Sequence, residues 1–147
     1  MKPLEDKLLC LLIQLPRSLK KEEGLPKLKR LIPHLWKKYR YAMEVRHNSW
    51  FDNDVYDVLT ENEICLVWSQ LDAIQIPAIA TSDFAYVRFI GDRSIPEEEF
   101  GKIQKDRDKE MQYQAAHLKT VNPKKLKIGI VAANNHYAGL SCDCKHV

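Results

Sequence analysis

Short apolar runs alternate with segments of helical periodicity along this chain. Five runs have the length of strands and end at Pro, Gly or polar residues: Leu8–Leu15, Tyr41–Arg46, Ile64–Ser69, Phe84–Ile90 and Lys127–Ala133. The first run, LLCLLIQL, is nearly all apolar, which is typical of a strand covered on both faces. Each connection between strands is long enough for a crossover, so the pattern predicts an α/β fold with a parallel sheet.

Helices are predicted in three of the connections, at Leu25–Tyr39, Asn53–Asn62 and Pro96–Val121. Pro33 lies within the first of these and should kink or split it. Asn53 or Asp54 can cap the second helix, and Asn62 is a plausible stop. The third begins with three glutamates, which favour the first turn of a helix. Residues 71–82 have no clear period and are expected to be irregular.

Length and composition fit a single globular domain. The chain has 147 residues, of which 45% are hydrophobic, and we expect a domain over residues 1–140 with a disordered tail at 141–147. The net charge of +3 is too small to indicate a nucleic-acid-binding protein. A local basic patch of Lys119, Lys124, Lys125 and Lys127 is interpreted as a solvated surface.

The apolar runs and the cysteines indicate a cytoplasmic protein that does not enter a membrane. The longest apolar run, Leu8–Ile13, is too short to cross a bilayer, and charged residues interrupt any secretory signal after Met1. Cys10 and Cys65 lie in apolar runs and are expected to be buried free thiols. The Cys142-Asp143-Cys144 spacing is too close for a usual zinc site.

The stretch Arg40–Phe51, RYAMEVRHNSWF, is the most informative part of the chain. Side chains alternate along a strand, so Ala42, Glu44 and Arg46 share one face. Two opposite charges on one face of a central strand are costly to bury unless they pair or take part in chemistry. The stretch therefore indicates where a site lies without defining its reaction.

The other predicted strands also end in polar or aromatic residues. In parallel α/β folds, ligands bind at the carboxyl ends of the strands, so these residues are expected to converge. The candidate catalytic residues are Glu44, as a general acid or base, with Arg46 and Arg88 as an anion clamp. The candidate substrate-binding residues are Gln14, His47, Trp68, Tyr86, Gly91, Arg93, Asn134 and Asn135.

Several alternatives remain beside this interpretation. The charged residues Glu44, Arg46 and Arg88 could instead form a buried structural network. Glu44, His47 and His136 could hold a metal, but no HExxH spacing supports it, and no metal is predicted. The sequence has no GxGxxG or GxxxxGK[ST] loop, which argues against an ordinary nucleotide fold, and the cofactor is unknown. Cys65 lies too early in its strand for a nucleophile.

The motifs LLIQLPRSLK, YAMEVRHNSWF, ICLVWSQ, TSDFAYVRFIGDR and NNHYAG, taken together and in this order, resemble the YecE-like family, also called domain of unknown function 72. The resemblance implies a TIM-barrel-like (β/α) fold and, because the family is uncharacterised, no particular activity. The family's recurrent polar positions correspond here to most of the candidates above and to Trp50.

The resemblance covers only part of the family's pattern. A Gly-Trp-containing first strand and an E-x-N-x-T-F-Y segment are missing, so we expect a partial barrel of about five strands. Its edges would be open, and a separate chain or a second copy could supply the other half. The expected ligand is small and polar or phosphorylated, bound near Gly91–Arg93 and Asn134–Asn135. A non-catalytic or truncated module is the alternative, so enzyme activity stays undecided.

Overall fold

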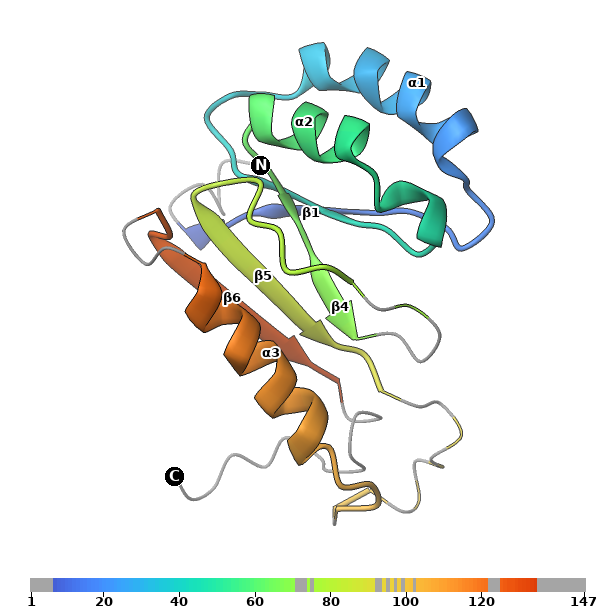
Figure 1. Cartoon of the computed structure of the whole chain (residues 1–147), viewed down its shortest axis with the longest axis vertical. Coiled ribbons are helices and arrows are strands. Elements are labelled where there is room, and N and C mark those ends of the chain that lie inside the picture. Colours follow the sequence, from blue (N-terminus) through green and yellow to red (C-terminus); the bar gives the residue numbers. More distant parts are fainter. Residues whose placement is uncertain are drawn as a thin grey trace.

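Parallel strands alternate with helices along the chain (Figure 1). The computed structural model describes residues 7–70, 74, 76–91, 94, 96, 98, 100–101, 103–121 and 125–134. Its elements are β1 (Leu11–Gln14), α1 (Lys21–Leu31), η2 (Ile32–His34), β2 (Tyr41–Glu44), η3 (Asn48–Trp50), α2 (Asn53–Glu61), β3 (Ile64–Leu66), β4 (Trp68–Gln70), β5 (Phe84–Phe89), α3 (Asp108–Thr120) and β6 (Ile128–Ala133). No helix in these ranges is both long and apolar enough to cross a membrane.

The strands form two parallel three-stranded sheets, in the orders β1-β2-β3 and β4-β5-β6. Only Val67 separates β3 from β4, and its N–H donates to the carbonyl of Met43 at 3.0 Å, which extends the β2–β3 ladder by one bond. The first half of this segment therefore pairs with β2 and the second half with β5. The single strand predicted at Ile64–Ser69 is in fact two short strands, and they join the two sheets.

A buried threonine explains why the strand divides. The hydroxyl of Thr81 accepts a hydrogen bond from the N–H of Leu66 at 2.8 Å and donates one to the carbonyl of Ile64 at 2.6 Å. Thr81 thus bonds to the backbone N–H and C=O groups of β3 that face away from β2. Thr81 is buried, and buried backbone groups need such partners. Pairing with β5 begins only after Val67, at Trp68 and Val87.

Helices α1 and α2 pack on the same side of the strands, over an apolar cluster (Figure 1). Trp50 is buried in this cluster, and its indole Nε1 donates to the carbonyl of Leu19 at 2.8 Å. A Cβ atom at Gly24 would lie 2.3 Å from Cζ2 of this indole, so only glycine fits that position of α1. Trp50, which the resemblance groups with polar site residues, is thus a packing residue.

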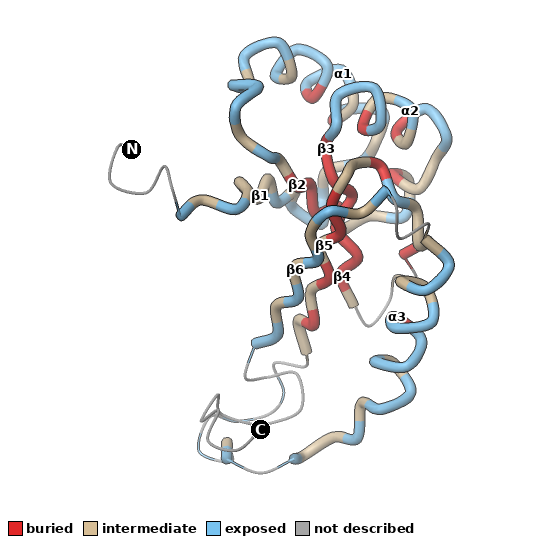
Figure 2. Tube along the Cα trace, turned by 90° about the vertical axis from the view of Figure 1, so that its left-hand side faces the viewer, coloured by how far each residue is buried: buried red, intermediate tan, exposed pale blue. Residues whose placement is uncertain are grey.

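The opposite face of the strands carries a second apolar cluster. It contains Ala42, Cys65, Val67 and Phe84, with Tyr86 packed against them. Figure 2 shows that burial is greatest in β2 to β5, whereas β1, β6 and most of α3 are partly or fully exposed. We call this face the inner face. Because side chains alternate along a strand, Glu44 lies on it with Ala42, and Arg88 lies on it with Phe84 and Tyr86.

Helix boundaries differ from the sequence predictions in three places. The first helix was expected at Leu25–Tyr39, yet α1 begins at Lys21 and η2 ends at His34. The third helix was expected from Pro96, yet α3 begins at Asp108, and residues 103–107 are not helical. Gly101 has φ of +111°, which a right-handed helix does not allow. The second helix is capped by Asp52, not by Asn53 or Asp54, because its carboxylate accepts from the N–H of Asp54 at 3.0 Å.

Other boundaries are confirmed. The helix around Pro33 does divide, with α1 ending at Leu31 and the short 3-10 helix η2 following it. Asn62 is the C-cap of α2, and its side-chain amide donates to the carbonyl of Val58 at 2.8 Å. The predicted tail at 141–147 lies outside the described residues.

Candidate functional site

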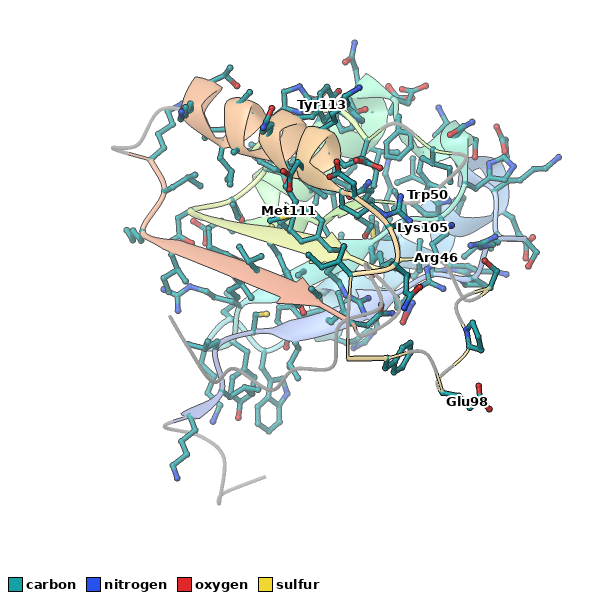
Figure 3. All side chains as sticks on the ribbon, turned by 90° about the horizontal axis from the view of Figure 1, so that it is seen from below. Arg46, Trp50, Glu98, Lys105, Met111 and Tyr113 are labelled. Atoms are coloured by element: carbon teal, nitrogen blue, oxygen red, sulfur yellow. The ribbon has the colours of Figure 1, made fainter. Side chains whose placement is uncertain are left out.

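A buried ion cluster lies on the inner face at the carboxyl ends of β2 and β5. Glu44 is the last residue of β2, and its side chain is 0% exposed. One carboxylate oxygen, Oε1, accepts a hydrogen bond from Nε of Arg46 at 2.7 Å. The other, Oε2, accepts from Nη1 of Arg88 on β5. In Figure 3 the arrowhead of β5 points toward the region in which Arg46 is labelled.

The balance of charge in this cluster favours an anion. A fully buried carboxylate is costly unless it is paired, and here two guanidinium groups share the single carboxylate of Glu44. The three side chains together carry a formal charge of +1. The side chains of Arg46 and Arg88 are 24% and 26% exposed, so both cations remain within reach of a ligand. The cluster can therefore bind an anion without losing its internal pairing.

Gln14 joins the cluster from β1, where it pairs in register with Glu44. Its amide can be placed in two ways. With Nε2 toward the cluster, it donates to Oε1 of Glu44 at 3.3 Å. With Oε1 there instead, it accepts from Nη1 of Arg46 at 3.1 Å and also from Nη2. The second placement is preferred, because the first sets an N–H₂ group against guanidinium donors.

Two other candidates on the strands lie away from the cluster. Trp68 is on the opposite face, where its indole packs with Val87 and Phe89 and its Nε1 donates to the carbonyl of Ile79 at 3.2 Å. Tyr86 is on the inner face but two residues before Arg88, among the apolar side chains. The structure therefore does not bring Trp68 to the ion cluster, and Tyr86 lies nearer the amino end of β5 than Arg88 does.

His47 follows Arg46, and its side chain caps the short helix η3. Its Nδ1 accepts from the N–H of Ser49 at 3.1 Å and caps the 3-10 helix η3, and it lies 2.9 Å from the Ser49 hydroxyl. The same hydroxyl accepts from the N–H of Lys21 at 2.8 Å, which ties the start of α1 to η3.

The remaining candidates lie in the loops that follow β5 and β6. Gly91 has φ of +76°, a conformation that glycine adopts without strain, so the chain turns there after β5. The N–H of Asn134 donates to the carbonyl of Phe89 at 3.1 Å, which places Asn134 at the carboxyl end of β5. Arg93 and Asn135, like His136, lie outside the described residues.

Neither a metal site nor a reactive thiol stands out in this part of the chain. The described residues contain no group of three or more His, Cys, Asp or Glu side chains placed to hold a metal ion. Burial raises the pKa of the Cys65 thiol to about 12, so this thiol is protonated and a poor nucleophile near neutral pH.

Ser69 is not among the candidate site residues above, although it is one of the polar residues at the end of the strand predicted at Ile64–Ser69. It is 1% exposed and pairs in register with Arg88, and its Oγ has no hydrogen-bond partner in the described part of the chain. In the sequence it is a small polar residue at the end of an apolar run, and such residues are also common in ordinary protein cores.

The comparisons with known proteins identify relatives of unknown activity. The family model described as "Protein of unknown function DUF72" matches residues 1–144. A DUF72 family protein of Thermotoga maritima MSB8 has 23% sequence identity and a TM-score of 0.68, over 94% of this chain and 56% of that one. One from Enterococcus faecalis V583 also has 23% identity and a TM-score of 0.68, over 92% of this chain and 58% of that one. No curated protein matches significantly.

Proposed function

This chain belongs to the DUF72 family, and we propose that it binds a small anionic molecule at the carboxyl ends of its strands. The observation that carries the proposal is the sharing of one buried carboxylate, Glu44, by two partly exposed guanidinium groups. Arg46 and Arg88 would hold the ligand, since guanidinium groups suit carboxylate and phosphate oxygens. Gln14 and Asn134 would line the same edge of the sheet.

Glu44 has a different role in this proposal from the one first expected. A general acid or base must approach the proton that it transfers, but the Glu44 side chain has no exposed surface and both oxygens accept from arginines. We therefore assign Glu44 to positioning the two guanidinium groups. The alternative, a purely structural ion network, differs in that its arginines would have no affinity for anions.

Ligand-induced stabilisation tests the binding site. A panel of phosphorylated metabolites and small carboxylates should contain a ligand that raises the melting temperature. At 100 times its Kd, such a ligand should increase the free energy of unfolding by about 2.7 kcal/mol. In Arg88→Ala the shift caused by this ligand should disappear. Arg30→Ala is the matched control, because Arg30 is an exposed arginine of α1 and its loss changes the net charge equally. If no ligand stabilises the wild type more than Arg88→Ala, the anion site is refuted.

We also propose that the sheet is part of a (β/α) barrel whose remaining strands come from a separate chain. The chain spans 56–58% of the length of the solved relatives, and in the described residues β1 pairs only with β2 and β6 only with β5. Open edges of this kind favour pairing with another strand. The free thiols of Cys10 and Cys65 fit a reducing, cytoplasmic location.

Light scattering on the purified chain tests the partner. Alone, the chain should associate or be poorly folded, because in the described residues β1 and β6 each have one edge with no strand beside it. A stable, well-folded monomer would contradict the proposal, whereas a discrete dimer would identify a second copy as the partner in place of a separate chain.

A further inference from the structure

Ser69 has a buried hydroxyl that the described part of the chain leaves unpaired. The residue is 1% exposed, and its Oγ has no hydrogen-bond partner in the described part of the chain. Buried polar groups are nearly always paired, since an unpaired one loses its hydration without compensation. The hydroxyl therefore needs an explanation, and its surroundings supply one.

The position of Ser69 relates it directly to the two arginines. It pairs in register with Arg88 on β5, and it follows Val67, which lies on the inner face, by two residues. Arg88 reaches Glu44 on β2, and the β3–β4 segment lies between these two strands. The side chain of Arg88 thus extends across the strand that carries Ser69, whereas Arg46 reaches Glu44 from two residues further along the same segment.

Each arginine of the cluster has side-chain nitrogens that do not bond to Glu44. Nε and Nη2 of Arg88 have no acceptor among the described residues, where Nη1 alone donates to Glu44. Arg46, Ser69 and Arg88 belong to three different segments, at the end of β2, in β4 and in β5. Three donor residues match a phosphate group, which has three terminal oxygens, better than a carboxylate, which has two.

On this basis we propose that Ser69 is a ligand-binding residue whose hydroxyl donates to a phosphate monoester held by Arg46 and Arg88. The proposal rests on the anion site proposed above and specifies its ligand. Oγ is covered in this structure, so the phosphate reaches it as the Arg88 side chain shifts toward the ligand while its bond to Oε2 of Glu44 is kept. Glu44 keeps Arg46 in place during this movement through the bond between Oε1 and Nε.

Calorimetric titration of the whole chain with inorganic phosphate, and with acetate at the same ionic strength, tests the proposal. Wild type should bind phosphate more tightly than acetate, and Ser69→Ala should weaken phosphate binding about tenfold. Ser82→Ala is the matched control, because Ser82 lies at the amino end of β5, where its hydroxyl bonds to Phe84 and to the Cys65 thiol and not to the ion cluster. Ser69→Cys, which keeps the volume but has a weaker donor, should lie between wild type and Ser69→Ala.

The outcomes separate this proposal from the anion site itself. Equal phosphate affinity in wild type and Ser69→Ala would overturn the role of Ser69 and leave the anion site standing. Binding of acetate but not phosphate would overturn the phosphate assignment alone. Binding of neither anion by the wild type would overturn both. Loss of an unpaired hydroxyl should not lower the urea midpoint of Ser69→Ala, so a large drop in that midpoint would show a structural role and also overturn the proposal.

Discussion

Glu44→Gln is expected to lower the free energy of unfolding by about 3–5 kcal/mol, the usual cost of breaking a buried ion pair from one side. The substitution keeps the size of the side chain but leaves two guanidinium groups without their counter-ion in a site where the carboxylate is 0% exposed. It also turns an amide N–H₂ group toward donors of Arg46 or Arg88. Urea unfolding followed by fluorescence of the buried Trp50 and Trp68 measures the change.

Glu110→Gln is the matched control for this prediction. Glu110 accepts from Nη1 of Arg107 at 3.0 Å, a bond that lowers the pKa of its carboxyl, but its side chain is 37% exposed. Exposed pairs contribute little, so the loss should stay below about 1 kcal/mol. Equal stability of Glu44→Gln and wild type would mean that Glu44 does not organise the arginines, and it would return Glu44 to the candidates for acid–base chemistry.

Thr81→Val should cost about 2–4 kcal/mol, because each buried backbone group that loses its partner costs about 1–3 kcal/mol. The change is nearly isosteric, so no cavity forms. It removes the acceptor for the N–H of Leu66 and the donor to the carbonyl of Ile64, at the point where the strand passes from one sheet to the other. The same urea titration measures the loss.

Thr81→Ser separates the hydrogen bonds from packing. Serine keeps the hydroxyl and loses one methyl group, which should cost only about 1 kcal/mol at a site that is 2% exposed. If Thr81→Val is as stable as Thr81→Ser, the hydroxyl does not complete the edge of β3, and another cause for the division at Val67 is needed.

Local sequence pattern was sufficient to predict most of the strands and the residues that meet in the ion cluster. The alternation in Tyr41–Arg46 places Glu44 and Arg46 on one face, and the same period in β5 places Arg88 with Tyr86. Because parallel strands align their carboxyl ends, Gln14 could also be assigned to this edge before its register with Glu44 was known. These predictions needed only the alternation of side chains along each strand and the parallel direction of the strands.

Features that depend on distant residues could not be predicted in this way. The division of Ile64–Gln70 depends on Thr81, whose hydroxyl acts across 15 residues of sequence on Leu66. The side to which Trp68 points follows from the inner-face position of Val67, and the apolar run ICLVW has no alternation from which to read it. Ser69 gains its interest only from the path of Arg88 toward Glu44.

The central claim is that Glu44 holds Arg46 and Arg88 as an anion-binding pair, and the Nε–H signals of the arginine side chains report on it most directly. In ¹⁵N-labelled protein titrated with inorganic phosphate, the signals of Arg46 and Arg88 should shift together along one saturating curve. The signal of the exposed Arg30 on α1 should not move. A titration in which no arginine signal shifts, or in which Arg30 shifts as much as Arg46 and Arg88, would contradict the claim.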